Sequence, residues 1–195
     1  AQGIEINVDF VFVDANGKLI DFLRYLLERE GHGSPIGKDI HILTDKFEDV
    51  AEDVIARIKA HGTAHRSLFF LDQYGWSAVT FATIRRIMGS LQNPEVVLTF
   101  MVDHLVNLLN DRMIDTAGLG AVDLARSDVK DMLEMKNLKG WKRYIQNTLY
   151  GHIQRNTGAK YYTPFFIHPE GGSNRDYWLL HLSKHHSARE EMGKI

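Results

Sequence analysis

The feature that most constrains this chain is a run of large apolar residues, Leu68-Phe69-Phe70-Leu71. Four such residues without polar alternation are typical of a strand buried on both faces, as in a parallel sheet. The run ends on Asp72-Gln73-Tyr74-Gly75, and apolar residues then follow helical spacing from Trp76 to Met88. Ligands of open α/β sheets bind at the carboxyl ends of strands, so this polar cluster is the first candidate for a site.

Strand and helix patterns alternate on both sides of this run, which predicts a parallel sheet with helices on both faces. Residues 103–139 read as a helical insertion, and the next two β-rich runs, around a loose loop, predict an antiparallel hairpin. We therefore expect a single domain, residues 1–195, with a Rossmann-like, mostly parallel sheet. The predicted strands are Ile6–Val13, Asp39–Asp45, Leu68–Leu71, Glu95–Val102, Tyr161–Ile167 and Asp176–Leu182; further helices are predicted near 19–27, 47–58, 141–156 and from Ser187.

Composition narrows the chemistry. The chain has no cysteine, which excludes disulfides, thiolate metal sites and cysteine nucleophiles. The net charge of −2 provides no overall attraction to nucleic acid, so any such site must be a local patch. No apolar run is long enough to span a bilayer, and we expect a cytoplasmic protein with no membrane contact. No Gly-rich phosphate loop and no nucleophile elbow occurs.

Three aspartates, Asp14, Asp45 and Asp72, each follow a predicted strand directly. In one parallel sheet their carboxylates would line one edge, where an acidic residue can accept hydrogen bonds from ribose hydroxyls. Alternatively, each aspartate caps the helix that follows it. A nuclease that holds Mg²⁺ with Asp45 and Asp72 is a further alternative.

The segment Asp72-Gln73-Tyr74 suits a specific chemistry. An exocyclic amine on a nucleobase is a poor nucleophile because its lone pair is delocalised into the ring. A carboxylate and a backbone carbonyl can hold the amine hydrogens while an aromatic ring stacks on the base. The alternative is a tight strand-to-helix turn in which Tyr74 packs into the core.

The C-terminal histidines His181, His185 and His186 invite a metal interpretation, but metal sites usually need a third ligand and an ordered second shell of contacts. Lys184 and Arg189 lie close by in the sequence, so a basic patch that contacts phosphate is the preferred interpretation. No residue is assigned to a metal.

Several short motifs, in consistent order, resemble the three-Cys-motif partner proteins. They are Phe69 to Trp76, Ile84 to Ile87, Glu95 to Met101, Asp176 to His186 and Met192 to Ile195. That family is similar to class I S-adenosylmethionine-dependent methyltransferases, whose members that act on base amines carry Asp/Asn-Pro-Pro-Tyr/Phe after the fourth strand.

The resemblance implies S-adenosylmethionine as cofactor and methyl transfer to a base amine in DNA or RNA. It assigns Asp14 to the ribose, Asp45 to the adenine ring, and the trio Asp72, Gln73 and Tyr74 to catalysis. The cysteines of the family name belong to a partner protein, which is an expected partner here.

Two departures from the family pattern accompany this resemblance. Gln73 replaces a proline, which removes a fixed φ, and no strand with a glycine turn precedes Ile6, so we expect an N-terminal strand to be missing and the sheet to have a gap. The alternative function is a non-catalytic partner or nucleic-acid-binding module, with Arg85, Arg86, Lys184 and His185 as its contact surface.

Overall fold

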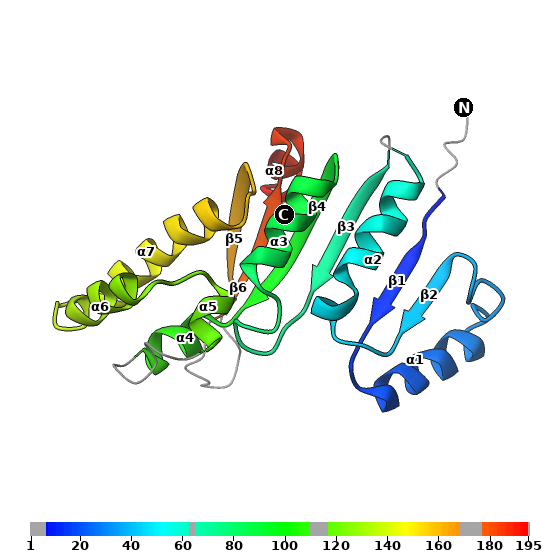
Figure 1. The fold of residues 1–195 in the computed structure, drawn as a ribbon, viewed down its shortest axis with the longest axis horizontal. Helices are drawn as coiled ribbons and strands as arrows, with labels where there is room; N and C mark the ends of the chain where they lie inside the picture. The colour runs from blue at the N-terminus through cyan, green and yellow to red at the C-terminus, as the bar shows by residue number, and fades with distance from the viewer. Residues whose placement is uncertain (1–6, 63–64, 110–116, 168–176, 195) are drawn as a thin grey trace. The chain divides into compact units, whose positions relative to one another are not determined.

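The computed structural model describes residues 7–62, 65–109, 117–167 and 177–194. The chain divides into two compact units, Ala1–Ala56 and Arg57–Ile195, and Figure 1 labels their helices and strands. The prediction that the whole chain forms one domain stays a prediction.

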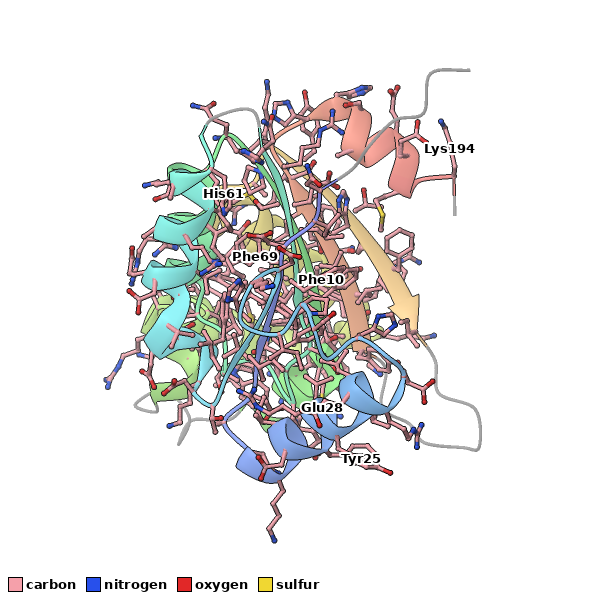
Figure 2. All side chains as sticks on the ribbon, turned by 90° about the vertical axis from the view of Figure 1, so that its right-hand side faces the viewer. Phe10, Tyr25, Glu28, His61, Phe69 and Lys194 are labelled. Carbon is pink, nitrogen blue, oxygen red and sulfur yellow. The ribbon has the colours of Figure 1, made fainter. Side chains whose placement is uncertain are left out.

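The first unit is built on a pair of parallel strands, β1 (Phe10–Val13) and β2 (Ile40–Leu43), with Phe10 opposite Ile40 and Val13 opposite Leu43. Helix α1 (Gly17–Arg29) connects them. Figure 2 shows Tyr25 extending outward from α1. Helix α2 (Phe47–Ala60) follows β2, and its last residues belong to the second unit. Its apolar residues Val50, Ala51, Val54 and Ile55 are buried.

The second unit contains a four-stranded sheet in the order β3-β4-β6-β5. The strands are β3 (Arg66–Leu71), β4 (Asn93–Phe100), β5 (Tyr161–Ile167) and β6 (Tyr177–Ser183). β3 and β4 are parallel, whereas β6 runs antiparallel to both of its neighbours. The helices of this unit are α3 (Phe81–Ser90), α4 (Val102–Leu108), α5 (Ala117–Ala121), α6 (Arg126–Met135), α7 (Trp141–Asn156) and α8 (His186–Met192).

The core of the second unit lies between one face of this sheet and helices α3 and α7. Strand β4 contributes Val96, Leu98 and Phe100, which are fully buried and alternate along the strand as one face requires. The ring of Phe81 on α3 contacts that of Phe100, with centroids 6.4 Å apart. α3 lies in front of the sheet in Figure 1. This core therefore fixes the positions of the segments that follow β3 and β4.

The prediction of one Rossmann-like, mostly parallel sheet is wrong. Among the described residues the strands form a two-stranded parallel sheet and a four-stranded mixed sheet. The alternation of strand and helix correctly located the elements, but it does not specify which strands pair with one another. Among the described residues β1 pairs with β2 alone, and β3 is an edge strand of the larger sheet.

The apolar run Leu68–Leu71 is also only half buried. Phe69 and Leu71 are buried, but Leu68 is 55% and Phe70 is 73% exposed. Side chains alternate between the two faces of a strand, and only the face with Phe69 and Leu71 is covered here. The prediction of burial on both faces was therefore wrong for this strand.

Other predicted boundaries shift by a few residues. The helix expected from Trp76 begins only at Phe81, where Thr80 accepts a hydrogen bond from the Thr83 N–H. The strand expected to end at Val102 ends at Phe100.

The C-terminal predictions are confirmed in outline. β5 and β6 form the antiparallel hairpin, with Tyr161 opposite Ser183 and Ile167 opposite Tyr177. The insertion at 103–139 is helical in the parts described, as α4, α5 and α6. The predicted loop at 168–175 and the first strand residues, Ile6 and Asp176, lie outside the described residues. Of the helices described, none has the length and apolar composition needed to cross a membrane.

Candidate functional site

The segment Asp72-Gln73-Tyr74-Gly75 follows β3 directly, at its carboxyl end. Asp72 is exposed, and no hydrogen bond to its carboxylate occurs among the described residues. Tyr74 is 78% exposed, whereas Gln73 between them is only 5% exposed. The segment therefore presents a carboxylate and an aromatic ring to solvent on either side of a buried amide.

Two hydrogen bonds hold this loop in place. The Gln73 Oε1 accepts from the Val79 N–H at 2.9 Å, which closes a loop between residues six positions apart. The Gly75 carbonyl accepts from the Met101 N–H at 3.0 Å and so ties the loop to the end of β4. Gly75 has φ of +96°, a conformation that glycine adopts without strain. Gln73 thus fixes the loop through its side chain, where the resemblance expects a proline ring.

The two purely structural alternatives for this loop, a helix-capping Asp72 and a Tyr74 packed in the core, disagree with the structure. Thr80, not Asp72, caps α3, so Asp72 is not a helix cap. Tyr74 does not pack into the core, since most of its surface is exposed. The buried member is Gln73, whose Nε2 has no hydrogen-bond partner among the described residues.

Two residues that the sequence analysis did not assign to the site lie beside this loop. The His104 ring on α4 meets the Tyr74 ring at 6.5 Å and the Trp76 ring at 5.1 Å between centroids, edge to face in both cases. Trp76 is buried. The sequence assigned Trp76 to a helix and His104 to the helical insertion. The sequence around each residue gives no sign of this contact, because the contact depends on how β3 and β4 pair.

In the first unit, Asp14 and Asp45 follow β1 and β2 at the same edge of the parallel pair. The Asp14 Oδ1 accepts from the Asn16 N–H at 2.6 Å, and Asn16 in turn caps α1. Asp14 therefore lies two residues before the N-cap residue, Asn16, and is not the cap itself. Asp45 is exposed.

A cavity of about 190 Å³ opens beside Asp14 in the same unit. Its other walls are apolar side chains of β1 and α1 (Phe12, Val13, Leu19, Ile20 and Leu23). This cavity is open to solvent and smaller than the roughly 300–1,000 Å³ of typical small-molecule sites, so it can contact only part of a ligand.

The structure groups two of the three predicted aspartates. Asp14 and Asp45 share an edge, but Asp72 belongs to the second unit and to a different sheet. The expectation that all three line one edge depended on the single sheet and does not hold. Asp45 and Asp72, the two carboxylates of the nuclease alternative, likewise belong to different units.

The C-terminal histidines have protein partners. His181 is buried, and its Nε2 lies 2.9 Å from the Glu95 Oε2. His185 Nε2 lies 3.3 Å from the Gln92 carbonyl, and His186 contacts Glu190 at 3.4 Å. Among the described residues, no three His, Asp or Glu side chains gather in a way that could hold a metal ion.

Two residues of the proposed basic contact surface, Arg85 and Lys184, already bind other groups within the protein. Arg85 pairs with Asp123 and donates to the Asn156 carbonyl, which joins α3 to the ends of α5 and α7. The Lys184 Nζ donates to the Leu91 carbonyl at 2.9 Å. These cations stabilise the fold of the second unit, which reduces their availability for phosphate.

Comparison of the chain with protein-family models, curated proteins and solved structures finds no match.

Proposed function

We propose that the loop Asp72–Gly75 binds the exocyclic amine of an unpaired nucleobase in DNA or RNA, and that the protein is an S-adenosylmethionine-dependent N-methyltransferase. The observation that supports it is an exposed carboxylate and an exposed aromatic ring on one loop fixed by Gln73 and Gly75. The aromatic ring can stack on any base, because every base has a flat face. The carboxylate can select the bases that carry an exocyclic amine.

The chemistry that these residues offer follows from the amine. The Asp72 carboxylate, free of partners among the described residues, can accept an N–H and so increase the electron density on nitrogen. A ring stacked on Tyr74 would hold the base in the orientation that this hydrogen bond requires. A fixed loop makes both contacts without reordering at the moment of reaction.

The cofactor assignment fits in part. S-adenosylmethionine, when bound, supplies an electrophilic methyl group. The apolar cavity beside Asp14 would contact part of its adenosine, and Asp14 keeps one carboxylate oxygen for the ribose while the other holds Asn16. Asp45, at the same strand edge, is available to the adenine ring. No residue of the described chain is assigned to its methionine part.

A second function, a nucleic-acid-binding module without catalysis, is favoured by one observation. The base-binding loop is complete within the second unit, whereas both candidate cofactor residues belong to the first. On either proposal a cysteine-containing partner protein, as the resemblance implies, remains a proposed partner.

The first experiment tests recognition of the amine. Binding is measured by fluorescence anisotropy with a single-stranded oligothymidine that carries one adenine, and with the same strand carrying purine, which lacks the amine. We expect tighter binding to adenine and loss of this preference in Asp72→Ala, by about tenfold or more, as for a hydrogen bond to a charged group. Asp131→Ala, an exposed aspartate on α6, is the matched control. Equal binding of the two strands would contradict the proposal.

The second experiment separates the two functions. Calorimetry measures the binding of S-adenosylmethionine and S-adenosylhomocysteine to the protein. Binding that Asp14→Ala weakens supports the methyltransferase. No heat at millimolar ligand, with the adenine preference retained, would eliminate the methyltransferase and leave the binding module.

A further inference from the structure

We propose that His104 is a positioning residue that orders the exposed Tyr74 ring for base stacking. This inference rests on the proposed function and deepens it. The observation behind it is that His104 contacts two aromatic rings at once, one exposed and one buried.

An exposed tyrosine needs such support. With 78% of its surface in solvent, Tyr74 has few contacts of its own to select one side-chain conformation. Fixing a free side chain on binding opposes association, so a ring that is ordered beforehand binds more tightly. The exposed fraction also leaves room for a base on Tyr74 beside the contact with His104.

His104 is well placed to provide this order. It lies on α4, whose neighbouring residues Val102, Leu105 and Val106 are completely buried, so the helix is anchored in the core. Its ring also packs against Trp76, which is 8% exposed. The rings of Trp76, His104 and Tyr74 thus form a series of edge-to-face contacts from the core to the surface.

The backbone keeps the two ends of this series in register. Met101, the residue that precedes α4, donates its N–H to the Gly75 carbonyl, next to Tyr74. The start of α4 and the loop therefore cannot separate without breaking this bond. Because this bond joins the two backbones, the His104 and Tyr74 rings stay within reach of each other.

The substitution that tests the inference replaces the ring without removing its volume. His104→Leu keeps a side chain of similar size but no aromatic edge, whereas His104→Phe restores an edge-to-face partner. We expect His104→Leu to weaken binding of the adenine-containing strand by about 2- to 10-fold, the effect of one aromatic pair. His104→Phe should restore it. In a Tyr74→Ala background, His104→Leu should have no further effect, because the two act as a unit.

A second measurement does not depend on any ligand. Order parameters from ¹³C relaxation report the motion of the Tyr74 ring in protein labelled at tyrosine. They should fall in His104→Leu and recover in His104→Phe. An unchanged ring order in His104→Leu would overturn the inference. If the ring order falls as expected but no variant binds the strand, the proposed function fails while the positioning role stands.

Discussion

Tyr74→Ala is the substitution that most directly separates binding from stability. The phenol ring lies largely in solvent, so the folded protein loses little when it is removed. The proposal gives this ring its main contact in the complex rather than in the free protein. The same change should therefore have a large effect on affinity and a small effect on folding.

The two magnitudes can be compared. Stacking of a base on an aromatic side chain contributes about 1–3 kcal/mol, which corresponds to roughly a 5- to 150-fold loss of affinity in Tyr74→Ala. An exposed surface substitution usually changes the free energy of unfolding by about 0.5 kcal/mol or less. Tyr74→Phe keeps the ring and should bind as the unchanged protein does.

The assay is anisotropy with the adenine-containing strand at one fixed salt concentration, since salt alone changes such affinities. Stability is followed in parallel by tryptophan emission in urea, which reports the second unit because Trp76, Trp141 and Trp178 all lie there. A loss of less than twofold in affinity, with the urea midpoint unchanged, would refute the stacking role. A large fall in the midpoint would show instead that Tyr74 supports the fold.

Four further predictions concern the second unit. Tyr162 buries a hydroxyl that has no partner among the described residues, so Tyr162→Phe should raise the free energy of unfolding by about 1 kcal/mol. Burial, and to a lesser extent Tyr150, raises the pKa of Tyr162 above its ordinary 10.0. Above pH 10 the unfolded chain loses this proton before the folded protein does, so the free energy of unfolding should decline as pH rises. Urea titrations of Tyr162→Phe should lack this decline. Glu95→Val leaves the buried His181 Nε2 without its partner and should lower the free energy of unfolding by about 1–3 kcal/mol, while Glu95→Gln, which keeps an acceptor, should lose less; equal urea midpoints for the two would contradict this. Gly75→Ala places a residue with a Cβ at φ of +96°, and no atom lies within 4 Å of the new methyl group. A fall of about 1–2 kcal/mol in the free energy of unfolding, measured by the same urea assay, would therefore come from backbone conformation alone. No fall would mean that the loop does not need this φ.

The limits of prediction are clearest at the candidate site. Asp72 and Tyr74 were identified from their place after an apolar run, and both are exposed at the end of β3 as a ligand site requires. Gln73 was assigned a backbone role, but its buried side chain holds the loop at Val79. His104 was missed because its partners lie about thirty residues away in the sequence and meet it only through strand pairing.

The sequence by itself determined where the helices and strands lie, because apolar periodicity and turn residues act over a few neighbours. It also placed a carboxylate and a phenol directly after β3. Only the tertiary structure decided that the strands form two sheets, that one face of β3 is open, and that His104 adjoins Tyr74. The reason is that strand pairing and burial depend on residues far apart in the sequence. A strand has the same local pattern whether or not another element covers it. The run Leu68 to Leu71 shows this, since its pattern predicted a strand correctly and its environment wrongly.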